Sequence, residues 1–454
     1  MLSRSSLCRQ AQRAARQSFQ QRRGLAAPAS GSFEYQTGDA QGIKYAARDI
    51  PGPVATLAIV TKAGTRYQPL PGLTEGLQRY AFKHTERRST LRIQREAELL
   101  GSALEAWHTR ESLVIGAKFL RDDLPYFVEL LAEVASMTKY EQHVFDEEIY
   151  DLIKMSQKKL LADTTSLAFN SAHSLAFHRG LGEPLSPSSS TPLSKYLDAE
   201  TVEHFARTAY SKPQFAIVAN GAESATLSKW INEFFTDIPS QPAEQLTSAQ
   251  SKYHGGEERI AHASGNSIVL GFPGSSSPTG SSFKPEVAVL AELLGGESSI
   301  KWNSGFSLLS KAKGTAAGLS VSTKSNIYSD AGLLTVTISG GAKDVRSSAA
   351  SAVEALKTIA QGVSKEDFAK AKALAKFREL EYGQETQAAL ELTGTGLVSH
   401  GKPYQIDDVA KAVDGVTEDK VKQIAKEALE NKASVSAVGD LFVLPFAEEI
   451  GLKV

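Results

Sequence analysis

The chain has 454 residues, of which 41% are hydrophobic and 22% are charged, a balance typical of globular proteins. No run of 18 or more apolar residues occurs, so the sequence predicts no transmembrane helix, and any membrane association would be peripheral. The 50 basic and 51 acidic residues nearly cancel and form no basic stripe, which argues against a nucleic-acid partner.

The first 25 residues differ in composition from everything after them. They contain six arginines and no acidic residue, and the first acid is Glu34. This composition is typical of a mitochondrial transit peptide, with a disordered basic tail as the alternative. The pattern "RRGLAA" predicts cleavage near Ala26. Cleavage would remove Cys8, the only cysteine, and leave 44 basic against 51 acidic residues, a net charge of −7. A chain without cysteine has no disulfide and no cysteine metal site.

The stretch "GLTEGLQRYAFKHT" predicts a short amphipathic helix from residue 72. Leu73, Leu77 and Tyr80 recur with the spacing of one helical face. A second face carries an acid, an amide and a cation, at Glu75, Gln78 and Arg79.

Several pairs of stretches share one order at an offset of about 220 residues. The strand "SLVIGAKF" and two following helices parallel "LLTVTIS" and two helices, the second beginning at a predicted N-cap, Ser364. "LDAETVEHFARTAY" parallels "VDGVTEDKVKQIAKEAL", and "FAIVANG" parallels "ASVSAVG". Four ordered pairs at one offset predict a duplicated domain of roughly 200 residues.

We therefore expect an α+β fold of two homologous layered domains, each with helices packed on a largely antiparallel β-sheet. The predicted boundaries are a presequence at 1–25, an N-terminal domain at 26–236, a linker at 237–257 and a C-terminal domain at 258–454. The linker is rich in Pro, Gln, Ser and Gly and shows no periodicity. The order of the strands stays open.

The long repeat, the strand with "TKAGTRYQ" and the helix "GLTEGLQRYAFKHT" together resemble the pitrilysin-type zinc peptidases, the family of mitochondrial processing peptidase. In that family the helix carries H-x-x-E-H, whose histidines bind zinc and whose glutamate activates water. A further glutamate, about 77 residues on, completes the ligand set. The corresponding positions here are Glu75, Gln78, Arg79 and Ser156. Arginine is a permanent cation and glutamine has no basic site, so the resemblance implies an inactive peptidase homologue without catalytic residues, metal or cofactor.

The sequence offers no second catalytic or metal motif. Its nine histidines form neither H-E-x-x-H nor H-x-x-E-H, and there is no G-x-x-x-x-G-K-[ST] loop or G-x-S-x-G turn. His173 and His178 are five apart, which favours core or surface histidines over ligands.

Glu75 precedes Arg79 by four residues, the favourable order for an ion pair on a helix. The four site positions sum to zero charge, as would zinc with two histidines and two glutamates. One interpretation is that the ion pair replaces the metal structurally. The other is that these positions have drifted on a solvated face.

Three functions are open within the family: a core protein of mitochondrial ubiquinol–cytochrome c reductase (respiratory complex III), the presequence-binding alpha subunit of processing peptidase, and an active zinc endopeptidase. Arg79 argues against the last. The alpha subunit carries a dense glycine loop, but the corresponding "LLGGESSIKWNSGFSLLSKA" has only Gly295, Gly296 and Gly305, with Ile300 and Trp302 between them.

That stretch and the C-terminal "SAVGDLFVLPFAEEIG" resemble the fungal core proteins of complex III. The resemblance implies a noncatalytic structural subunit, needed for assembly and only indirectly for electron transfer. It further implies a peripheral location on the matrix side of the mitochondrial inner membrane. Expected partners are another core protein, cytochrome b and further subunits of a dimeric complex.

Overall fold

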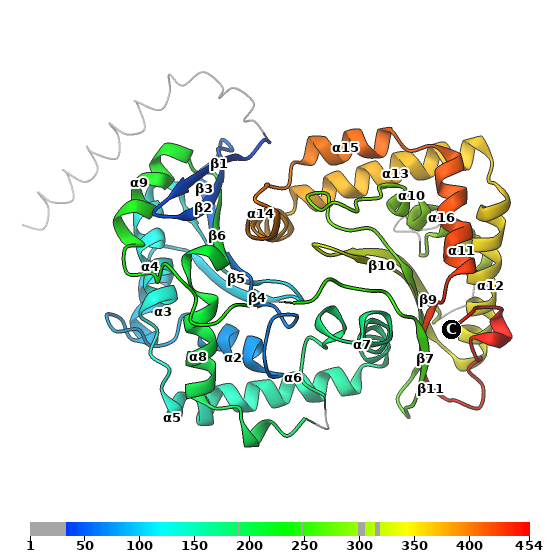
Figure 1. Cartoon of the computed structure of the whole chain (residues 1–454), viewed down its shortest axis with the longest axis horizontal. Helices are drawn as coiled ribbons and strands as arrows, with labels where there is room; N and C mark the ends of the chain where they lie inside the picture. Colours follow the sequence, from blue (N-terminus) through cyan, green and yellow to red (C-terminus); the bar gives the residue numbers. More distant parts are fainter. Residues whose placement is uncertain (1–32, 189–190, 247, 298–304, 314–317) are drawn as a thin grey trace, which may run out of the picture.

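The computed structural model describes residues 33–188, 191–246, 248–297, 305–313 and 318–454. Two halves, each built around one β-sheet, lie side by side (Figure 1). The predicted presequence, residues 1–25, lies outside the described residues, as do Ile300 and Trp302.

The first sheet has six strands in the order β1-β2-β6-β3-β5-β4, and only β2 and β6 pair in parallel. β1 and β2 form a hairpin whose two turn residues, Gln41 and Gly42, have φ of 57° and 77°, as a tight two-residue turn requires. The strands are β1 (Gln36–Ala40), β2 (Ile43–Arg48), β3 (Val54–Thr61), β4 (Ala103–His108), β5 (Leu113–Leu120) and β6 (Phe215–Asn220).

The second sheet repeats five of these strands in the same order, β7-β11-β8-β10-β9, again with one parallel pair, β7 and β11. The predicted duplication and the largely antiparallel α+β fold are thus confirmed. Within the described residues this sheet has no counterpart of β1. Its strands are β7 (Gly256–Ala261), β8 (Asn266–Pro273), β9 (Ser320–Ile327), β10 (Gly332–Gly340) and β11 (Ser434–Gly439).

Helices cover both sheets, and their starts follow local capping chemistry. The predicted N-cap is confirmed, because Ser364 Oγ accepts from the Asp367 N–H at 3.0 Å. Asp163 ends α6 and caps α7 by accepting from the N–H groups of Thr165 and Ser166. None of the described helices is both long and apolar enough to cross a membrane.

In the first half the helices are α2 (Leu73–Tyr80), α3 (Thr90–Leu99), α4 (Leu124–Ser136), α5 (Gln142–Val144), α6 (Tyr150–Ala162), α7 (Thr164–Phe177), α8 (Ala199–Ala209) and α9 (Ser224–Phe234). In the second half they are α10 (Glu286–Leu294), α11 (Leu308–Lys313), α12 (Ala342–Gln361), α13 (Lys365–Gln384), α14 (Thr386–His400), α15 (Ile406–Asp414) and α16 (Glu418–Glu430).

Each half lends one helix to the sheet of the other half. Helix α7 belongs to the first half in sequence, yet its buried Ala168 and Ala172 pack against β8 and β11 of the second sheet. Helix α14 does the reverse, and Leu390 and Leu397 pack on β2, β3 and β6 of the first sheet (Figure 1). Separating the halves would therefore expose the inner apolar face of both sheets, which ties the two folding units together.

The contact between α14 and β3 depends on a residue without a side chain. A Cβ atom at Gly394 would lie 2.4 Å from Val60 Cβ, too close for any two carbon atoms. In an unobstructed helix, replacing glycine by alanine stabilises by roughly 0.5–1 kcal/mol. Here the added methyl group would push α14 off the sheet.

We expect Gly394→Ala to destabilise the protein by about 1–3 kcal/mol, measured as the loss of free energy of unfolding in urea. Gly52→Ala is the matched control, because nothing lies within 4 Å of a Cβ at that position. The control should change stability by less than about 0.5 kcal/mol. A Gly394→Ala protein at least as stable as the parent would show that α14 does not dock tightly.

Candidate functional site

Helix α2 carries three of the four positions that correspond to the peptidase site. It follows the N-cap residue Gly72, whose φ of 94° favours glycine, and it packs against α8. A Cβ at Gly76 would lie 2.9 Å from Val202 Cγ2, so this close approach of the two helices requires glycine. The approach buries Glu75, whose exposed fraction is 2%.

Three of the predicted site residues lie together although one is far away in sequence. Arg79 Nη2 lies 3.4 Å from Glu75 Oε1 and donates to Ser156 Oγ at 3.2 Å. Ser156 is on α6, which runs beside α2. The ion pair between Glu75 and Arg79 expected from their spacing is therefore present. Glu75 is buried and so does not lie on a solvated face, whereas the Arg79 side chain is 33% exposed.

The carboxylate of Glu75 depends on this one cation. Its second oxygen, Oε2, is buried and accepts no hydrogen bond from any described residue, and Arg79 Nε is likewise buried without a partner among them. A buried charge without a partner is strongly unfavourable. Arg79 therefore compensates Glu75 from the same place in the helix at which the family has a zinc-binding histidine.

Gln78 is turned away from this pair and bound to β4. Its Nε2 donates to the Ala106 carbonyl at 2.8 Å, and its Oε1 lies 2.5 Å from His108 Nδ1. The other ring nitrogen of His108 lies 2.9 Å from the Leu185 carbonyl oxygen. Burial lowers the pKa of His108. This contact was not predictable from the sequence, because nothing in the spacing of Gln78 and His108 sets them apart from other polar pairs.

The arrangement provides no set of ligands for a metal ion. A guanidinium repels cations, and the amide of Gln78 and the hydroxyl of Ser156 have no negative charge to offset that repulsion. Across the described part of the chain, no group of three or more His, Cys, Asp or Glu side chains is placed to hold a metal. What the arrangement provides is an ion pair within α2 and a hydrogen bond from Arg79 to Ser156 of α6.

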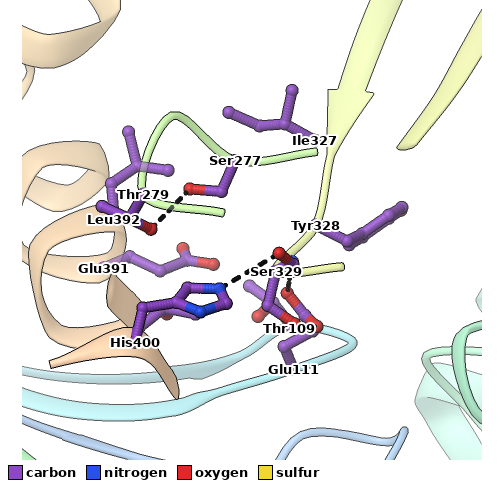
Figure 2. Close-up of a pocket in the computed structure, with 11 residues that line it drawn as sticks. Thr109, Glu111, Ser277, Thr279, Ile327, Tyr328, Ser329, Glu391, Leu392 and His400 are labelled. Carbon is purple, nitrogen blue, oxygen red and sulfur yellow. Dashed lines mark hydrogen bonds between the residues drawn. The ribbon is translucent and has the colours of Figure 1, made fainter. Parts of the chain in front are cut away.

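A cavity of about 70 Å³ lies away from this site, between the two halves of the chain (Figure 2). We call this region of contact between the halves the seam. Glu111 accepts from both the N–H and the hydroxyl of Ser329, at 2.7 and 2.5 Å, and His400 Nε2 lies 3.1 Å from the Ser329 carbonyl oxygen. The volume is that of about two water molecules, far below the roughly 300 Å³ of a small-molecule site. This cavity is therefore part of the seam and not a substrate pocket.

A buried ionic contact in the seam is made by Arg66, whose side chain is only 4% exposed. Its Nη1 donates to Glu111 Oε1 at 2.7 Å, and its two terminal nitrogens donate to the two oxygens of Asp330 at 2.7 Å each. Burial lowers the pKa of Arg66, but the bond to Asp330 and the two negative charges outweigh it and raise the pKa overall. Glu111 is 45 positions and Asp330 is 264 positions away from Arg66 in the sequence, yet both bind its guanidinium. These contacts were not predicted from the sequence.

His173 sits at the same seam on α7 and is fully buried. Its Nδ1 lies 2.8 Å from the Phe169 carbonyl and its Nε2 lies 2.9 Å from the Tyr328 hydroxyl, so the neutral ring satisfies both atoms. Burial, and secondarily the charge of Arg110, lower the pKa of His173 well below its ordinary value. Of the core and surface alternatives expected for His173, the structure shows a core histidine with both ring nitrogens satisfied.

Two of the glycines in the loop after α10 have a packing reason to be glycine. A Cβ at Gly295, whose φ is 65°, would lie 2.2 Å from Ser307 Cβ, and a Cβ at Gly296 would lie 2.4 Å from the Val321 carbonyl oxygen. They allow the chain to turn tightly against its neighbours.

Comparison with known proteins identifies the family. The model of the insulinase family, peptidase family M16, matches residues 45–186, and that of the peptidase M16 inactive domain matches residues 196–374. Cytochrome b-c1 complex subunit 2, mitochondrial, of Neurospora crassa is 49% identical over 100% of both chains. The proteins of the same name from Schizosaccharomyces pombe and Yarrowia lipolytica are 34% and 33% identical, over 92% and 94% of this chain and 95% and 99% of theirs.

The ion pair of α2 can be tested by a double-mutant cycle on Glu75 and Arg79. Arg79→Ala leaves a buried carboxylate without its cation, so we expect it to lower the free energy of unfolding by roughly 1–3 kcal/mol. This is less than the roughly 3–5 kcal/mol for a fully buried pair, because Arg79 is partly exposed. In a Glu75→Gln background, the same arginine substitution should cost less than half as much. Equal costs in both backgrounds would mean that the two charges are not coupled.

Because of His173 in the seam, we expect the folded protein to lose stability in mild acid. Its pKa in the folded protein is below that of the unfolded chain, about 6.5, so the unfolded chain takes up the additional proton as the pH falls. The stabilisation is complete above pH 6.5 and is lost below it, by at most about 1.4 kcal/mol per pH unit. Urea unfolding between pH 7.5 and 5 should show a shallower pH dependence for His173→Gln, whereas the exposed-site control His143→Gln should keep the parental slope. Parallel slopes for all three proteins would exclude His173 as the cause.

Proposed function

This chain belongs to the insulinase family, peptidase family M16, and from that premise we propose that it is a noncatalytic structural subunit of the mitochondrial cytochrome b-c1 complex, respiratory complex III. The proposal is supported by three fungal relatives of nearly the same length that carry the name of subunit 2 of that complex. The chain would be needed for assembly and stability of the complex, and so indirectly for electron transfer from ubiquinol to cytochrome c.

The observation that carries the noncatalytic part is the place of Arg79. Its guanidinium lies between Glu75 and Ser156, where the family's zinc ligands would converge, and it bonds to both. A zinc ion could enter only by displacing a permanent cation from a buried carboxylate. We therefore propose that Glu75, Gln78, Arg79 and Ser156 are degenerate positions, without catalytic or metal-binding activity.

The proposed partners and location follow from the same resemblance. We propose that the chain pairs with core protein 1 and contacts cytochrome b in a dimeric complex. It would lie peripherally on the matrix side of the inner membrane, after loss of a presequence at residues 1–25. The single cysteine, Cys8, falls within that presequence, so the mature chain would have no thiol for redox chemistry. The domain boundaries at 26–236, 237–257 and 258–454 remain part of this proposal.

The alternative within the family is the presequence-binding alpha subunit of processing peptidase. It is marked by a flexible glycine loop, whereas Gly295 and Gly296 here are held in tight contact with Ser307 and Val321. Glycines that are required for packing do not provide that flexibility. This contrast favours the structural subunit.

Cells that lack this protein would distinguish the structural subunit from the alpha subunit. If it is a structural subunit, assembled complex III should be depleted in native gels, and cytochrome c reduction by mitochondrial membranes should fall in proportion. Full-length precursors of other matrix proteins should still be processed at the normal rate. Immediate accumulation of many unprocessed precursors, with complex III at first intact, would instead identify the alpha subunit.

A further inference from the structure

The two sheets differ at one edge. In the first sheet β1 covers the outer edge of β2, with Gln36 opposite Ala47 and Ala40 opposite Ile43. In the second sheet the strand at the same place, β7, pairs only with β11 among the described strands. Within the described ranges, the second sheet therefore has one strand fewer than the first on that side.

The path of the chain before β7 explains why no counterpart of β1 pairs with β7 among the described strands. Residues before β7 would have to fold back as a hairpin, as β1 does before β2, but they cross the seam instead. Ala249 accepts from Arg66, the Ser251 N–H donates to Asp330, and the His254 N–H donates to the Ala176 carbonyl of α7. The linker is thus occupied in joining the halves and is not available to complete the sheet.

The hydrogen bonds of β7 show which of its backbone groups are left over. The N–H of Gly256 donates to the Ala433 carbonyl at 2.9 Å, and the N–H of His262 donates to the Gly439 carbonyl at 3.2 Å. In the parallel register the even-numbered residues therefore face β11. The N–H and C=O groups of Glu257, Arg259 and Ala261 point outward, and no described residue bonds to them.

Two exposed aromatic side chains lie on the turn that follows β11, near the same edge. Phe446 is 51% exposed and rests on the guanidinium of Arg259, 3.6 Å from the ring centroid. Phe442 is fully exposed, and the Arg259 side chain donates to the backbone of residues 441 and 444 on either side of it. Large aromatic side chains exposed together commonly mark a protein contact.

We infer that the outer edge of β7 is a docking site for an extended segment of another subunit of the complex, which adds a sixth strand to the second sheet. This inference rests on the proposed function and specifies one interface of it. The backbone of the incoming segment bonds to the outward groups of Glu257, Arg259 and Ala261. Its apolar side chains on the outer face cover Phe446 and Phe442. The first sheet shows the geometry, because β1 occupies the equivalent edge of β2.

Hydrogen exchange resolved by residue tests the inference, comparing the isolated chain with the chain in purified complex III. The amides of Glu257, Arg259 and Ala261 should exchange quickly in the isolated chain and at least about a hundred-fold more slowly in the complex. Those of Glu258 and Ile260 should be protected in both. Tyr45 and Ala47, whose amides face β1, serve as the internal control and should also be protected in both.

Substitution of the exposed aromatics gives a second, independent measurement. Phe442→Ser with Phe446→Ser should reduce retention of the chain in the complex at raised salt by about ten-fold, because buried aromatic contacts dominate interfaces. The thermal midpoint of the isolated double variant should match that of the parent. Phe377→Ser, at a phenylalanine of α13 that is 59% exposed, should leave retention unchanged.

Three results would overturn the inference. Fast exchange at the three β7 amides in an intact complex that contains the chain would exclude an added strand and leave the proposed function standing. Protection that appears in the isolated chain as its concentration rises would make the occupant a second copy. A purified complex III that lacks the chain would refute the proposed function, and with it this interface.

Discussion

The guanidinium of Arg66 joins the two halves of the chain at one buried point. It binds Glu111 of the first half and Asp330 of the second, and its side chain is almost completely shielded from water. Leaving either carboxylate buried without this cation would cost roughly 3–5 kcal/mol. The contact therefore ties the two halves together at this point, and the exchanged helices α7 and α14 bury the inner face of each sheet.

This seam does not depend on the positions that correspond to the zinc site of the family. Glu75, Arg79 and Ser156 lie on α2 and α6, whereas the seam is made by Arg66, the β4–β5 turn and the β9–β10 turn. The two-domain architecture therefore does not require zinc ligands at these positions, provided that the buried charge of Glu75 is compensated. Arg79 lies where it supplies that compensation, which supports the proposal that the chain is an inactive peptidase scaffold acting as a structural subunit.

The sequence predicted the repeated parts of the fold well, because apolar strands and N-caps are local signals that recur at one offset. The spacing of Glu75 and Arg79 also predicted a real contact, since residues four apart lie on one face of a helix. The exchange of α7 and α14 was not predictable, because helical periodicity shows that a helix has a buried face but not which sheet it covers. The contacts of Arg66 were missed for the same reason, as its partners lie far away in the chain.

The central claim is that this is an inactive peptidase scaffold in which Arg79 takes the place of the metal. Elemental analysis of zinc in the chain purified within complex III tests it most directly, with peptide hydrolysis measured on the same sample. The account predicts well under one zinc per chain and no hydrolysis that a chelator abolishes. One zinc per chain, lost together with peptidase activity on chelation, would contradict it.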